Sequence, residues 1–162
     1  MTKHRMKAVA IAAASMAVLA VSAMVPATAA PGNNGTVKVD NIALDNQPNA
    51  NEPHVGCEFR IEWYGFDPSV TSHVTFEAQP PTGTRLLLED DVTLSSNATP
   101  GGSPAAFDGE EYYTLDFNDG DFFHPQQGYH VYLTINTPTS NGADVKHKVF
   151  WVQGCDVPPP PV

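Results

Sequence analysis

The chain has 162 residues and a net charge of −10, with 18 acidic residues against 8 basic ones. This balance argues against nucleic acid or an anionic membrane surface as partners, because both need a cluster of Lys and Arg. The length suits one domain with a single hydrophobic core.

Residues 1–29 are predicted to be a secretory signal peptide. Lys3, Arg5 and Lys7 precede an apolar, Ala-rich stretch over residues 8–25, and small residues follow it. This is the pattern of a cleaved leader, whereas a membrane-spanning helix is usually richer in larger apolar residues. Cleavage removes three basic residues and no acidic one, so the net charge falls from −10 to −13. We expect a secreted protein, extracellular or loosely bound to the cell envelope, without a stable membrane span.

The mature chain is expected to begin with a flexible linker over residues 30–35, before a domain over residues 36–155. A short strand is predicted within Thr36–Leu44, and a loop rich in Pro and Asn follows it. The strand Gly56–Tyr64 has the sharpest alternation of apolar and charged residues in the chain. Its inward side chains are expected to be Cys57, Phe59, Ile61 and Trp63.

The middle of the domain shows weaker patterns. A strand is predicted over His73–Gln79, and Thr84–Leu94 fits either one bent strand or two short ones. Ser95–Gly109 is poor in apolar residues and is expected to be a loop. The next strand is predicted over Glu111–Phe117, and an acidic loop leads from it to the last two strands.

The last two strands are expected to form an antiparallel hairpin over Tyr129–Ile135 and Val145–Val152. The turn between them contains Asn141 and Gly142, which accept the positive φ of hairpin turns. In the first strand, His130, Tyr132 and Thr134 are expected to point outward. In the second strand, we expect Val145, Val149 and Trp151 to point inward, and Lys146, Lys148, Phe150 and Val152 to point outward.

Cys57 and Cys155 are the only two cysteines, and in an exported chain they are expected to form a disulfide. Seven to eight short strands without a credible helix after the leader predict an all-β fold, an antiparallel immunoglobulin-like β-sandwich. A jelly roll or small barrel is the alternative. The Pro-rich tail over residues 156–162 cannot continue a sheet.

The segments NEPHVGC, GYHVYLT and KHKVFWVQGC resemble those of small secreted β-sandwich proteins from actinobacteria. The resemblance covers Thr36 to Cys155. It implies export and a sandwich fold, and it implies neither an activity nor catalytic residues.

Candidate sites for chemistry are few. His54 and His124 are weak candidates for a metal site, since both predicted loops lie near the disulfide and imidazole is a common ligand of transition metals. The acidic segment DFNDGD has the wrong register for an EF-hand, because Gly stands at its fifth position instead of its sixth. There is no nucleophile elbow and no cofactor signature, so we expect no cofactor and no enzyme.

The outward residues of the hairpin are the most promising binding surface. His130, Tyr132, Lys146, Lys148 and Phe150 would place two of the five mature basic residues beside aromatic side chains. Mixed apolar and polar patches often mark interaction sites. We expect a monomeric, non-catalytic module that binds an extracellular protein or an envelope polymer. A structural envelope component, or a protein that binds a small ligand or a metal, is the alternative.

Overall fold

The computed structural model describes residues 35–44, 51–98, 107–138 and 144–155, and the expected leader, nearly all of the linker and the tail lie outside these ranges. The described residues form eight strands and no α-helix, together with one 3-10 turn at Ile42–Leu44. The strands are β1 Thr36–Asp40, β2 His54–Val55, β3 Glu58–Tyr64, β4 Thr71–Ala78, β5 Leu86–Thr93, β6 Phe107–Thr114, β7 Tyr129–Asn136 and β8 Val145–Val152.

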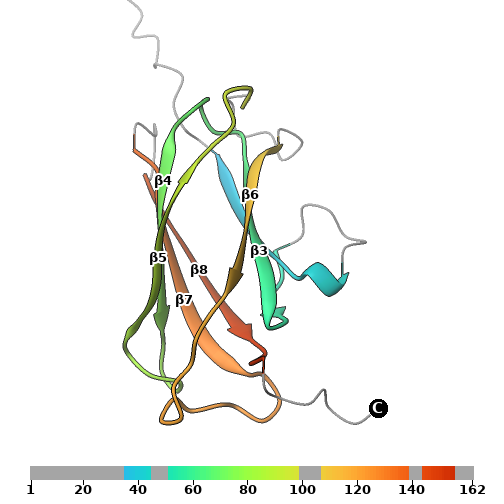
Figure 1. Cartoon of the computed structure of the whole chain (residues 1–162), viewed down its shortest axis with the longest axis vertical. Helices are drawn as coiled ribbons and strands as arrows, with labels where there is room; N and C mark the ends of the chain where they lie inside the picture. The colour runs from blue at the N-terminus through green and yellow to red at the C-terminus, as the bar shows by residue number, and fades with distance from the viewer. Residues whose placement is uncertain (1–34, 45–50, 99–106, 139–143, 156–162) are drawn as a thin grey trace, which may run out of the picture.

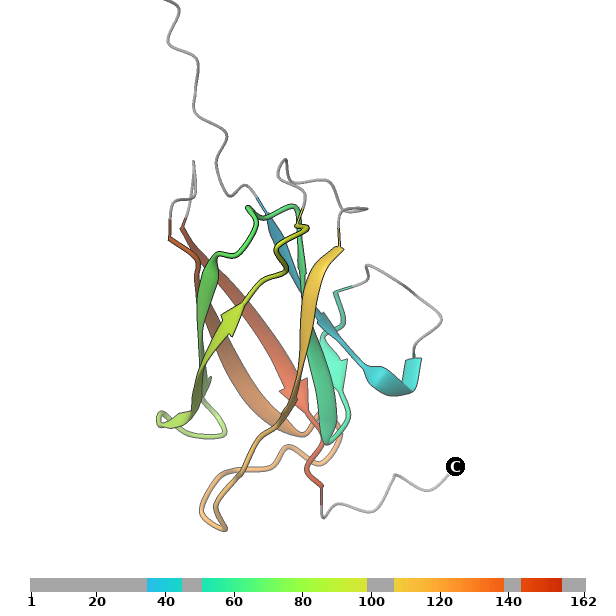
Figure 2. The ribbon, with the colours of Figure 1, turned by 45° about the horizontal axis from the view of Figure 1, so that its top comes forward.

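The strands form two sheets that pack face to face (Figure 1; Figure 2). One sheet has the order β1-β3-β6 and the other the order β2-β8-β7-β4-β5. All neighbouring strands are antiparallel except β2, which pairs in parallel with β8. The prediction of an all-β, mainly antiparallel sandwich is confirmed.

Two elements differ from the sequence-based expectation, and the sequence leaves a third open between two alternatives. β6 begins at Phe107, inside the expected loop, because Phe107 and Gly109 pair with Tyr64 and Trp63 of β3. Of the two alternatives left open for Thr84–Leu94, the structure has the single strand, β5. β2 is a two-residue strand beside a predicted loop, and it forms through pairing with β8. Each difference comes from long-range pairing, which local residue patterns do not encode.

An aromatic cluster joins the two sheets across the core. The Phe59 ring of β3 meets the Phe76 ring of β4 edge-on at 5.8 Å and the Phe150 ring of β8 at 5.3 Å. Tyr113 of β6 completes the cluster, with its ring centroid 4.8 Å from that of Phe76. Trp63 is fully buried beside this cluster, as predicted. Such edge-on pairs add about 0.5–1.5 kcal/mol each beyond the burial of their area.

The Cys57–Cys155 disulfide is present, as predicted, with the two Cα atoms 4.7 Å apart. Cys57 immediately precedes β3 in one sheet, and Cys155 follows β8 in the other. The bond therefore clamps the two sheets together at one end of the sandwich.

The predicted orientation of β8 is wrong. β8 pairs with β7 so that Phe150 lies opposite Val131 and Val149 lies opposite Tyr132. Residues directly opposite each other share a face, and Val131 points into the core, so Phe150 must do the same. Phe150 is 1% exposed and Val149 is 48% exposed. Lys146 and Lys148 share the inner face with Phe150, whereas Val145, His147, Val149 and Trp151 lie on the outer face.

We predict that losing the disulfide strongly destabilises the fold. The two cysteines are 98 residues apart, and closing a loop of this length stabilises a protein by up to about 4–5 kcal/mol through the entropy of the unfolded chain. Urea unfolding of the intact protein and of the double variant Cys57→Ser with Cys155→Ser measures the difference. Denaturing alkylation of both thiols without a reductant would show that the bond is absent.

A matched pair of substitutions tests the orientation of β8. Phe150→Ala should lower the free energy of unfolding by about 3–5 kcal/mol, because it leaves a cavity in the aromatic cluster. Val149→Ser, on the outer face, should change it by less than about 0.5 kcal/mol. Chemical denaturation of both variants measures these values. A larger loss of stability in Val149→Ser than in Phe150→Ala would support the orientation predicted from the sequence, with Val149 inward.

Candidate functional site

The outer side of the last two strands carries a surface that we call the hairpin face. β7 contributes three of its side chains and β8 the other three. They are His130, Tyr132, Thr134, His147, Val149 and Trp151. The two predicted site residues of β7, His130 and Tyr132, belong to this face.

Rings on the hairpin face are stacked against one another. The His130 ring lies 4.2 Å from the Trp151 ring at an interplanar angle of 20°, and the Tyr132 and His147 rings are stacked at 5.2 Å. The Nδ1 atom of His130 donates a hydrogen bond to the Pro80 carbonyl oxygen at 2.7 Å, which leaves Nε2 as an acceptor in the neutral ring. These contacts hold the rings in defined positions.

The other three predicted site residues, Lys146, Lys148 and Phe150, are absent from the hairpin face. Phe150 belongs to the core. The ammonium group of Lys146 lies 5.5 Å from the centre of the Phe66 ring, a cation–π distance. Burial lowers the pKa of Lys148, and the positive charge of Lys38 lowers it further. The two lysines thus line the inner side of the sandwich instead of a docking surface.

His54 and His124 lie at the same end of the hairpin face. His54 is exposed and is paired in register with Trp151, and the ring of His124 lies 5.7 Å from that of Trp151. In the part of the chain that the structure describes, no three His, Cys, Asp or Glu side chains gather closely enough to hold a metal ion. The two histidines therefore adjoin the hairpin face at Trp151.

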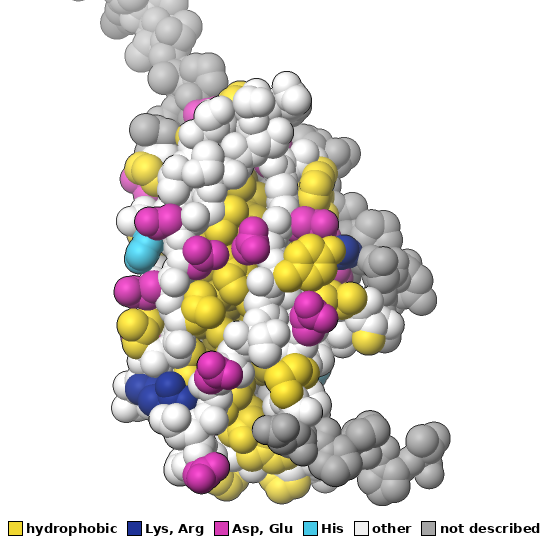
Figure 3. Space-filling view, viewed as in Figure 1, with side chains coloured by type: hydrophobic (Ala, Val, Ile, Leu, Met, Phe, Trp, Pro, Cys, Tyr) yellow, Lys and Arg dark blue, Asp and Glu magenta, His cyan; other side chains and the backbone are white. Residues whose placement is uncertain are grey.

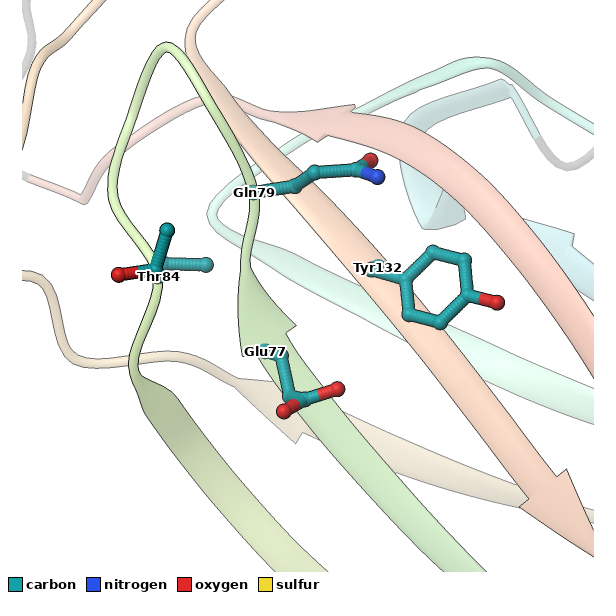
Figure 4. A pocket seen from close by; sticks show the side chains of 5 residues that line it. Glu77, Gln79, Thr84 and Tyr132 are labelled. Atoms are coloured by element: carbon teal, nitrogen blue, oxygen red, sulfur yellow. The ribbon is translucent and has the colours of Figure 1, made fainter.

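A shallow hollow of about 180 Å³ adjoins the hairpin face, and we call it the Gln79 hollow (Figure 4). Tyr132 forms one wall, and the side chains of Glu77 and Gln79 extend from β4 and its end on either side of Tyr132. The side-chain oxygen of Gln79 is buried and has no hydrogen-bond partner among the residues that the structure describes. Its lining residues are Glu77, Ala78, Gln79, Thr84 and Tyr132. This hollow could not be predicted from the sequence, because β4 and β7 are brought together only by sheet pairing.

A charged network occupies the outer side of the three-stranded sheet. Arg60 contacts the carboxylates of Asp40 at 2.5 Å, Glu62 at 3.2 Å and Glu110 at 3.3 Å. The hydroxyl of Tyr64 donates to Glu62 at 2.7 Å, and burial raises the pKa of the Glu62 carboxyl. A buried acid with a raised pKa is a feature of many active sites. Here, however, Arg60 and Tyr64 pair with the carboxylates through ion pairs and a hydrogen bond, so the network stabilises the fold.

The side of the sandwich between β5 and β6 shows hydrophobic side chains flanked by acidic ones (Figure 3). Both strands lie at sheet edges, and each carries acidic residues, such as Asp90 of β5 and Glu111 of β6. The hydroxyl of Tyr113 reaches across to Asp90 at 3.2 Å. Charges on edge strands oppose pairing with another chain. This side is therefore better explained by protection of the edges than by partner binding.

Part of the acidic segment DFNDGD also stabilises the fold. Asp121 forms an ion pair with Arg85 at 2.6 Å and accepts a hydrogen bond from the backbone of Asn118. The Arg85 guanidinium is the main reason why the pKa of Asp121 lies below its usual value.

No known family, curated protein or solved structure matches the chain. Within the described ranges, no helix is long and apolar enough to cross a membrane.

We predict that Lys148→Met stabilises the protein at pH 7. A lowered pKa means that folding disfavours the charged ammonium, so the folded state binds fewer protons than the unfolded state between that pKa and the ordinary value of 10.5. The stability of the wild type should therefore rise with pH across this window, and the advantage of the variant should shrink. Thermal unfolding of both proteins from pH 7 to 10 measures this change.

Lys148→Arg is the matched control, because arginine stays charged from pH 7 to 10. The rise in stability with pH that is due to Lys148 should therefore be absent in this variant. A Met variant that melts below the wild type at pH 7 would show instead that the ammonium makes a favourable contact.

Proposed function

We propose that the protein is a secreted, non-catalytic immunoglobulin-like module that binds an extracellular or cell-envelope partner through the hairpin face. The observation that carries this proposal is the exposure of Val149 beside the stacked rings of Trp151, His130 and Tyr132. Protein interfaces are enriched in aromatic side chains, and apolar groups rimmed by polar ones mark binding surfaces.

The strand order supports the immunoglobulin-like assignment. Without the two-residue β2, the sheets read β1-β3-β6 and β8-β7-β4-β5. This order agrees with the constant-type immunoglobulin arrangement except that the fourth strand, β5, pairs with the third strand instead of the fifth. The disulfide differs from the antibody pattern, because it joins the start of β3 to the end of β8 instead of the middles of two strands.

Secretion is supported by the leader-like N-terminal sequence and by a disulfide, which persists best outside the cytosol. A mature net charge of −13 opposes self-association, so we propose that the module acts as a monomer. A structural envelope component would need a surface for self-assembly, and the acidic edge strands oppose one.

We predict that Val149→Glu weakens partner binding at least about tenfold, because it places a charge in the centre of the hairpin face. Purified exported protein is incubated with protein and polysaccharide fractions of the envelope and the culture medium. The bound component is identified, purified and titrated by calorimetry.

Tyr112→Glu is the matched control, since Tyr112 is exposed to a similar extent on the other sheet. It should leave the affinity unchanged. A partner that binds the wild type and Val149→Glu equally would remove the hairpin face from the proposal, and a wild type that binds none of the fractions would overturn it.

A further inference from the structure

We propose that the Gln79 hollow receives a Lys or Arg side chain from a protein partner. This inference rests on the proposed function, because the hollow shares Tyr132 with the hairpin face. It names the chemistry of the partner, a basic side chain on its docking surface.

The first argument is the supply of acceptors in the hollow. The Gln79 amide lines the hollow, and its oxygen is buried without a hydrogen-bond partner among the described residues; a turn of the amide toward the hollow would let a donor recover the free energy that this missing bond costs. The Glu77 carboxylate is exposed and can only accept hydrogen bonds. A ligand rich in donors is therefore the best complement.

The second argument is the aromatic wall. The Tyr132 ring stacks on His147 through one of its faces, and its side chain also lines the hollow, between Glu77 and Gln79 (Figure 4). An ammonium or guanidinium group near a tyrosine ring gains a cation–π attraction. Arginine can also donate several hydrogen bonds at once to acceptors that lie around it.

The third argument is charge. None of the residues that line the hollow is basic, and the expected mature chain carries a net charge of −13. Such a potential attracts cations and repels anionic polymers. Size adds to this argument, because about 180 Å³ is less than the 300–1,000 Å³ usual for whole small-molecule ligands. A single side chain of a larger partner suits the hollow better.

A neutral sugar unit is the competing occupant, since it also offers donors and can pack on a tyrosine. The two occupants respond differently to charge. A cation should bind less well when Glu77 is neutralised and better when Gln79 becomes acidic, whereas a neutral sugar should respond to neither change in charge.

Nuclear magnetic resonance titration tests the proposal with small probes. N-acetyl-arginine amide and N-acetyl-lysine amide should shift the Gln79 side-chain amide signals and the Tyr132 ring signals. N-acetyl-citrulline amide, the neutral analogue of arginine, and a hexamer of N-acetylglucosamine should not. The shifts should weaken in 0.5 M salt, because exposed charge pairs are screened.

Variants give the quantitative test. Glu77→Gln should weaken arginine binding about two- to fivefold, the range of an exposed ion pair. Gln79→Glu should strengthen binding and steepen its salt dependence. Glu89→Gln is the control, because Glu89 is exposed on β5 outside the hollow and its substitution changes the net charge equally.

Two outcomes would overturn the inference. One is a response to citrulline or the sugar as large as the response to arginine. The other is an equal loss of arginine binding in Glu77→Gln and Glu89→Gln, which would indicate a general acidic field. Partner binding that depends on Val149 but not on Glu77 would contradict this inference and leave the proposed function intact.

Discussion

The register between β7 and β8 is the constraint on which the rest of the structure depends. Because Phe150 lies opposite Val131, one face of β8 supplies an aromatic ring to the core and the other supplies Trp151 and Val149 to solvent. A shift of one residue would exchange the two faces. The core and the proposed binding surface are therefore two consequences of one pairing.

Two further contacts secure that arrangement. The ring of Phe59 packs against Phe150 across the sheets, and the disulfide ties the end of β8 to the start of β3. The first favours burial of one particular face of β8, and the second restrains the strand where it leaves the sheet. A domain this small buries a limited core, so a covalent clamp between its sheets contributes a large share of its stability.

Four of the five basic side chains of the expected mature chain are engaged within the fold, away from the proposed binding surface. Arg60 and Arg85 are both engaged by carboxylates within the molecule, and two lysines of β8 line the inner side of the sandwich. The outer face of the larger sheet is left with imidazole, aromatic and acidic groups. This distribution supports the proposal of a basic partner over nucleic acid or an anionic polymer.

The sequence by itself determined the sandwich class, most of the strands and the disulfide, because these depend on local alternation and on there being only two cysteines. It also placed His130 and Tyr132 outward, since β7 has apolar residues at only one parity. In β8, apolar residues occupy both parities, with Val149 and Trp151 on one and Phe150 on the other. Local pattern cannot choose between two such faces, and the pairing with β7 made the choice. The Gln79 hollow likewise exists only where β4 and β7, distant in sequence, meet in the folded sheet.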